Sequence, residues 1–207
     1  LAGNTDAEGR FQYKEGDAVT FFLGAVTLGT TAGKNLITPM DLVPDAQSLD
    51  DAAVLNIARL LQSLDTALEE GRLNIPSGID THVDQWLDTL GQPFGFDPDA
   101  YPFDALARDL FDYLADNMAN YQDGIDLVGA GEAENHMKES LLGVFDGSYA
   151  GTYDGDSAGD WCFQMHGGAI AGMAWDTEGY WYELEGSLNP DGSMVVGTAD
   201  DGTTFQG

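Results

Sequence analysis

The sequence predicts an α+β protein in which an N-terminal β hairpin is followed by a helical middle and a C-terminal antiparallel β meander. Three observations predict this class: a β-rich alternation in residues 1–44, helical spacing of apolar residues in 45–143, and short strands divided by glycine-rich turns in 144–207. With 207 residues and 43% hydrophobic content, the chain can build an ordinary core. We expect one compact domain over residues 1–207.

The first region contains the sequence GRFQYKEGDAVTFFLGAVTLG. Phe11 and Tyr13 alternate with polar residues, the motif EGD at 15–17 predicts a turn, and the run from Val19 to Leu28 is rich in β formers. We expect a hairpin or small sheet here. The segment NLITPMDLVP at 35–44 is expected to be extended.

The middle region is predicted to be helical. In SLDDAAVLNIARLLQSLDTAL, Ser48 and Asp51 resemble a capping box. Apolar residues then recur at helical spacing, namely Val54, Ile57, Ala58, Leu61, Leu64 and Leu68. Further helices are expected around 82–90, 103–121 and 131–143, and the segment LGQPFGFDPDAYPF at 90–103 predicts a loop packed by its own rings.

The last region predicts five or six short antiparallel strands from Gly147 onward. Turn signals lie at 155–159, 167–168, 177–179, 189–192 and 200–202. Because strand side chains alternate, Trp161, Phe163 and Met165 should share one face, with Cys162, Gln164 and His166 on the other. The sequence ends just after the start of a further predicted strand, which leaves open a continuation beyond Gly207 or a disordered end.

The charge is strongly acidic, with 36 Asp and Glu against 7 Lys and Arg and a formal net charge of -29. Such a surface repels nucleic acid and anionic membranes and attracts cations. No stretch has the length of a membrane helix, so no membrane insertion is expected. The acidity favours a soluble protein in an extracellular or salty setting.

The single cysteine, Cys162, excludes an internal disulfide and a thiol-based zinc cluster.

The motifs of common enzymes are missing from the sequence. There is no G-x-S-x-G turn, Cys162 lies in a predicted strand, and GAVTLGTTAGK lacks the spacing of a phosphate-binding loop. We expect no catalysis. An enzyme acting on an extracellular polymer is supported only by the abundance of carboxylates.

Two kinds of metal site are candidates. In YDGDSAGD, Asp154, Asp156 and Asp160 place hard oxygen ligands in a glycine-rich turn, which suits calcium although it does not match the EF-hand. The alternative is a polar hairpin turn. His82 and His136 both lie at the edge of a predicted apolar helix stripe, where we expect each imidazole to be half-buried. If they converge, they suit copper or zinc; a satisfied or solvated imidazole is the alternative for each.

The segment DAEGRFQYKEGDAVTFFLGAVTLGTTAGKNLITPMDLV, continuing into NIARLLQSLD, resembles a module of secreted and lipoprotein-type surface proteins of Gram-negative bacteria. It covers about the first third of the chain. The glycine-aromatic meander at the end resembles extracellular β modules from the same kind of protein. Both resemblances imply a secreted or outer-surface location rather than a particular reaction.

The layout of an acidic chain with few histidines and tryptophans is also similar to the copper-repressible surface proteins of methanotrophic bacteria, the MopE and CorA type. That resemblance implies one Cu(I) ion held by two histidines and by kynurenine made by oxidising a tryptophan. Carried onto this chain, it implies His82 and His136 as ligands and Trp86, one helical turn after His82, as the modified residue. The MopE spacing, with tryptophan two residues before histidine, does not occur here, and His166 with Trp161 is the alternative pair.

The leading hypothesis from the sequence is a copper-binding protein for copper acquisition, secreted or on the cell surface. The second is a non-catalytic surface or adhesion module, stabilised at most by calcium. The first hypothesis implies copper as the ligand and the second at most calcium, and an outer-surface partner is left open.

Overall fold

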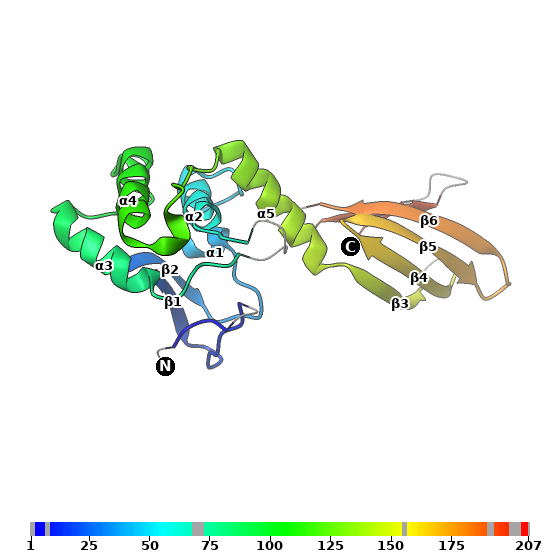
Figure 1. The fold of residues 1–207 in the computed structure, drawn as a ribbon. Helices are drawn as coiled ribbons and strands as arrows, with labels where there is room; N and C mark the ends of the chain where they lie inside the picture. The colour runs from blue at the N-terminus through cyan, green and yellow to red at the C-terminus, as the bar shows by residue number, and fades with distance from the viewer. Residues whose placement is uncertain are drawn as a thin grey trace. The chain divides into compact units, whose positions relative to one another are not determined.

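The computed structural model describes residues 3–6, 9–67, 73–154, 157–189, 193–198 and 204–206, the last of these by their backbone alone. It confirms the α+β class: an antiparallel pair of strands comes first, helices follow, and an antiparallel sheet closes the described chain (Figure 1). The elements are β1 (Ala18–Leu23), β2 (Val26–Ala32), α1 (Pro39–Leu42), α2 (Ala52–Ser63), α3 (Ile79–Leu90), α4 (Phe103–Asn117), a 3-10 turn (Ala119–Tyr121), α5 (Ala130–Val144), β3 (Gly147–Tyr153), β4 (Gly159–His166), β5 (Ala169–Asp176), β6 (Trp181–Leu188), β7 (Met194–Thr198) and β8 (Thr204–Gln206).

The chain divides into two compact units, residues 1–135 and 136–207, with the boundary inside α5. Each unit has its own cluster of buried hydrophobic side chains. The sequence led us to expect one compact domain over residues 1–207. Whether the two units form one domain depends on how they associate, so this expectation stays a prediction. Each unit is described by itself below.

The N-terminal hairpin turns at a different place from the one predicted. The motif at 15–17 does form a turn, but β1 begins only at Ala18, and the β-rich run folds back on itself at Gly24. Gly24 has a φ of 55°, which glycine adopts without a steric penalty. The next amide, that of Ala25, donates a hydrogen bond of 2.6 Å to Asp84 of α3. The hairpin is therefore held against α3 at its turn.

A short helix, α1, lies within the segment expected to be extended at 35–44. Pro39 occupies its first turn, where the fixed φ of proline favours a helix and its missing N–H is not needed. The Asp41 carboxylate accepts hydrogen bonds from the backbone N–H of Thr38 at 2.8 Å and from its hydroxyl at 3.0 Å. The expectation was wrong for residues 39–42, because a helix this short shows no helical periodicity in the sequence and depends on local capping.

The helix α2 is present as expected, but it ends at Ser63, before the predicted positions Leu64 and Leu68, and its N-terminal cap differs. Asp51, not Ser48, is the N-cap, and its carboxylate accepts from the amides of Ala53 and Val54. Ser48 instead donates to Asp50. The apolar positions Val54, Ile57, Ala58 and Leu64 are buried, whereas Leu68 lies outside the described residues.

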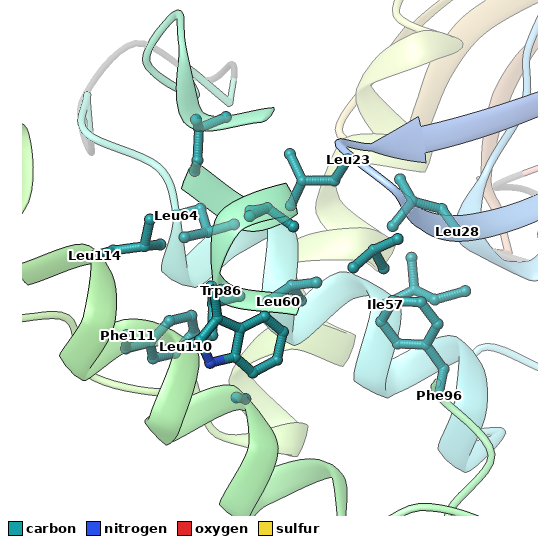
Figure 2. Close-up of a cluster of buried hydrophobic side chains, with 14 of the residues drawn as sticks. Leu23, Leu28, Ile57, Leu60, Leu64, Trp86, Phe96, Leu110, Phe111 and Leu114 are labelled. Atoms are coloured by element: carbon teal, nitrogen blue, oxygen red, sulfur yellow. The ribbon is translucent and has the colours of Figure 1, made fainter. Parts of the chain in front are cut away.

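The core of the first unit collects side chains from the hairpin, α2, α3, α4 and the loop that joins α3 to α4. Figure 2 shows Trp86 of α3 in this cluster together with Leu60 of α2 and Leu110 of α4. The connecting loop is packed by its own rings, as predicted: Phe94 contacts Phe96 at 5.4 Å between ring centroids and Trp86 at 5.6 Å.

The second unit is built on an antiparallel sheet with the strand order β3-β4-β5-β6-β7-β8 in the residues described. The predicted alternation is confirmed, because Phe163 and Met165 are buried while Gln164 and His166 are exposed. The buried face is a hydrophobic cluster made of Phe163, Met165, Ile170, Ala174, Leu184 and Val196. The predicted turns at 167–168 and 177–179 are present, and those at 155–159, 189–192 and 200–202 fall partly or wholly outside the described residues.

Candidate functional site

His82 lies on α3 and is half-buried, as expected. Its Nδ1 atom is buried and has no hydrogen-bond partner among the residues that the structure describes. Buried polar atoms are nearly always paired, so an unpaired ring nitrogen is the kind of atom that a metal or a bound water satisfies. This atom is the structural observation that favours a ligand near α3.

Trp86 occupies the buried stripe of α3, as predicted, and is 1% exposed. Its indole N–H donates a hydrogen bond of 2.9 Å to the carboxylate of Asp109 on α4, and its ring meets Phe94 edge to face. These contacts are those of a core residue. For an oxidised Trp86 to ligate copper, the side chain would have to leave both partners, and its role as a ligand stays a prediction.

His136 is exposed on α5, contrary to the half-buried position expected for it. The buried positions of this helix are Ala133 and Met137. Successive residues of a helix are about 100° apart around its axis, so His136 points away from the buried side and toward solvent. His82 belongs to the first unit and His136 to the second. The two-imidazole copper site therefore stays a prediction.

The alternative pair, His166 with Trp161, lies on opposite faces of β4, as the alternation predicted. The His166 side chain is 94% exposed, and its Nδ1 lies 2.7 Å from a carboxylate oxygen of Asp146. The other oxygen of Asp146 accepts the amide of Gly167 at 2.6 Å. Asp146 thus orients the imidazole and the turn after β4 together.

The proposed calcium ligands are placed only in part. Asp154 and Asp160 are both exposed and flank the β3–β4 connection, whereas Asp156 lies outside the described residues. Within the described ranges, no three or more His, Cys, Asp or Glu side chains are grouped so that they could hold a metal ion. The calcium site stays a prediction.

A depression of about 530 Å³ lies beside Arg59 in the first unit. The guanidinium is engaged with protein groups: its Nε donates to the carbonyl of Val128 at 2.8 Å, and Nη1 donates to Asp104 at 2.8 Å. It also lies over the ring of Phe103, 5.4 Å from the centroid. The Arg59 hydrogen bond lowers the pKa of Asp104. Arg59 therefore joins α2 to α4 and to the segment before α5.

The solvent face of the second sheet carries large apolar side chains that are normally buried. Met173, Trp175 and Trp181 are all exposed there, Trp181 at 68%. We call these three residues the tryptophan patch. Trp175 on β5 is directly opposite Trp181 on β6, and Met173 lies two residues before Trp175 on the same face. Exposed apolar groups that gather on one face are typical of interaction surfaces.

Three acidic side chains surround this patch. Asp160 on β4 is opposite Trp175, Glu183 is opposite Met173, and Glu185 follows Glu183 on the same face of β6. We call Asp160, Glu183 and Glu185 the flanking carboxylates. All three are exposed, and none of them has a side-chain hydrogen bond or ion pair to another described residue. Their charge is thus available to a partner.

The turn that joins β5 to β6 is fixed by Asp176. One oxygen of its carboxylate accepts the amides of Glu178 and Tyr180, both at 2.9 Å, and the other accepts the hydroxyl of Tyr182 at 3.3 Å. Gly179 has a φ of 90°, which closes the turn. Because Trp175 and Trp181 lie on either side of this turn, Asp176 sets the position of the tryptophan patch.

Sequence reasoning did not identify the tryptophan patch, although a signal was present. In the stretch AIAGMAWDTEGYWYELEG, the small or apolar residues Ile170, Gly172 and Ala174 occupy alternate positions and therefore share one face of the strand. The opposite face then receives Met173 and Trp175, and the turn at 177–179 brings Trp181 beside them. Applied to β5 and β6 as well as to β4, the alternation of side chains predicts that both tryptophans lie on the face opposite to Phe163.

Comparison of the chain with protein-family models, with curated proteins and with solved structures finds no significant match. In the ranges that the structure describes, no helix combines the length and the hydrophobicity needed to cross a bilayer.

Proposed function

We propose that this chain is a non-catalytic recognition module of a secreted or cell-surface protein, which binds its partner through the solvent face of the second sheet. The observation that carries this proposal is the tryptophan patch, in which Trp175 and Trp181 are paired across two strands and left in contact with water. Burying such side chains in an interface is strongly favourable, and tryptophan is enriched among the residues that dominate binding energies.

The acidity and the resemblance of the first third to surface modules support the location in this proposal. A net charge of -29 keeps a protein dispersed in salty surroundings.

Calcium bound by Asp154, Asp156 and Asp160 would stabilise the β3–β4 connection. If it does, calcium should raise the melting temperature, copper should not, and Asp154→Asn with Asp160→Asn should abolish the calcium effect.

The test of recognition uses arrays of peptides and oligosaccharides probed with the purified chain. We expect a set of ligands whose binding is lost in the double variant Trp175→Ala, Trp181→Ala. The control is Phe22→Ala, which removes an aromatic ring that is 59% exposed on β1 of the first unit. Equal binding by the double variant and the control, or no ligand at all for the wild type, would contradict the proposal.

A second candidate function is copper binding for copper acquisition, and the unpaired Nδ1 of His82 favours it. In this candidate His82 and His136 hold Cu(I), with kynurenine at position 86 as the third ligand. Metal analysis of protein purified from its native host tests it: stoichiometric copper should be present and should be lost in His82→Ala. Peptide mapping by mass spectrometry should find oxidised Trp86. Copper content unchanged in His82→Ala, or no copper in the native protein, would rule this candidate out.

A further inference from the structure

The flanking carboxylates restrict the chemistry of the partner that the tryptophan patch can bind. We propose that the patch and these carboxylates together bind an extended polypeptide segment that carries Lys or Arg at alternate positions. This inference rests on the proposed function, since it names the partner class for the same surface. It is carried by three features: the register of the strands, the spacing along β6 and the charge of the second unit.

The register places aromatic and acidic groups in one continuous area. Asp160, Trp175 and Trp181 are opposite one another across β4, β5 and β6. Neighbouring strands lie about 4.8 Å apart, so each carboxylate or ring in this row is within reach of the next. A cation placed over the Trp175 indole is therefore also close to the carboxylate of Asp160.

The spacing along β6 matches that of an extended peptide. Trp181, Glu183 and Glu185 are alternate residues of one strand and point to the same face. Alternate residues of a strand are roughly 6.8 Å apart, which is also the distance between alternate side chains of an extended ligand. A segment lying along β6 can thus present one cation to the Trp181 ring and one to each glutamate.

Both kinds of group attract cations. The face of an indole ring carries negative charge density and binds guanidinium or ammonium groups within about 6 Å. Carboxylates form charge-assisted hydrogen bonds with the same groups, and their pairs with arginine are often bidentate. Aromatic rings alone would also suit a sugar, but a neutral sugar would leave the three flanking charges unmatched.

The charge of the second unit supports a cationic partner over an anionic one. Residues 136–207 contain twelve Asp and Glu, whereas Lys138 is their single Lys or Arg. Polyanions such as nucleic acids are repelled by this surface, and basic segments are drawn to it over several ångströms at physiological salt. Association should therefore be faster and tighter at low ionic strength.

The experiment measures the affinity of the full chain for three synthetic eight-residue peptides by calorimetry and tryptophan fluorescence. The first has Arg at alternate positions separated by Thr, the second has the same residues with the four Arg consecutive, and the third has Gln in place of Arg. We expect the alternating peptide to bind most tightly, the consecutive one several-fold more weakly and the Gln peptide not measurably. Binding of the first should weaken as NaCl is raised from 50 to 500 mM.

Variants locate the site. Glu183→Gln with Glu185→Gln should lower the affinity for the alternating peptide about three- to tenfold, the range expected for two exposed ion pairs. The control is Glu178→Gln, which removes one charge from the nearby turn and should change the affinity by less than about twofold; the two variants are compared per charge removed. Circular dichroism verifies that each variant is folded.

The outcomes separate this inference from the proposed function. The same loss of affinity per removed charge in the Glu183→Gln, Glu185→Gln double variant and in Glu178→Gln would show attraction by net charge alone and would overturn the inference. Binding of the Gln peptide or of an oligosaccharide, lost in Trp175→Ala with Trp181→Ala but not in the glutamate variants, would also overturn it while leaving the recognition function intact. If no probe of any class binds, both proposals fail.

Discussion

Trp86 and Trp181 are the same amino acid in opposite surroundings. Trp86 is enclosed by the core of the first unit, and its N–H is paired with Asp109, whereas Trp181 contacts solvent on a sheet face. A buried ring contributes to folding through the area it removes from water, but an exposed ring can contribute only when a partner covers it. The first tryptophan is therefore structural, and the second is available for binding.

We expect Trp86→Ala to destabilise the first unit by about 3–5 kcal/mol, because it opens a cavity and leaves Asp109 without its donor. Phe22→Ala, at an exposed ring of the same unit, should stay within about 0.5 kcal/mol of the wild type. Urea unfolding followed by circular dichroism measures both. Similar losses in the two variants would show that Trp86 is not a core residue.

Tyr121 gives the first unit a dependence on alkaline pH. Its hydroxyl donates a hydrogen bond of 2.6 Å to the carbonyl of Leu64, at the C-terminal end of α2. Burial, with a contribution from the Asp65 carboxylate, raises the pKa of Tyr121 well above its usual value. The stability that follows from this raised pKa is present in full below the unfolded pKa of about 10 and is lost as pH rises toward the folded value.

Tyr121→Phe should lower the free energy of unfolding at pH 7 by about 1–3 kcal/mol, because the Leu64 carbonyl loses its partner. Above pH 10 the wild type should lose stability more steeply than this variant, so the difference between them should shrink. Tyr101→Phe serves as the control, as no hydrogen bond of its hydroxyl is found in the described residues. Parallel stability curves for wild type and Tyr121→Phe from pH 8 to 11.5 would argue against the role of the buried phenol.

Among the elements, the long helices and the predicted turns in the described residues are present, whereas the hairpin turn at Gly24 and the short helix α1 were missed. The long helices α2, α3, α4 and α5 have apolar residues at helical spacing over ten or more positions, a pattern that chance rarely produces. The turn at Gly24 and the helix α1 each depend on two or three residues, and their stability comes from contacts such as that between Ala25 and Asp84. Such contacts between distant segments leave no local pattern.

Glycines decide how closely the strands of the second sheet can pack. A Cβ on Gly172 would overlap the carbonyl oxygen of Cys162 and the backbone of Phe163, whereas one on Gly147 would meet only the Tyr149 ring at 3.6 Å. We expect Gly172→Ala to destabilise the second unit by about 1–3 kcal/mol and Gly147→Ala to be nearly neutral. Thermal unfolding of both variants measures this. An unchanged melting temperature in Gly172→Ala would show that the neighbouring strands can move apart to admit a Cβ without a loss of stability.

At the scale of the whole molecule, each unit encloses its own hydrophobic cluster. We therefore expect two unfolding transitions in scanning calorimetry, with Trp86→Ala shifting one and Gly172→Ala shifting the other. A single transition that both variants shift equally would instead support one cooperative domain over residues 1–207.

The net charge of -29 should make stability depend on salt. Raising NaCl from 10 to 500 mM screens the repulsion among carboxylates and should raise the melting temperature. CaCl₂ at matched ionic strength tests for specific binding, since an additional rise that is lost in Asp154→Asn would indicate a calcium site. A melting temperature that falls with NaCl would contradict dominant charge repulsion.

The sequence by itself determined the α+β class, the long helices, the two faces of β4 and the acidic character, because periodicity and composition are local properties of the chain. The helical spacing also predicted the burial of Trp86. Only the tertiary structure decided that the face carrying Trp175 and Trp181 stays exposed and which carboxylates have partners. Trp86 and Trp181 both lie in regular elements, and their difference arises from the segments packed against them. Burial is set by contacts between residues far apart in the chain, and those contacts exist only once the chain has folded.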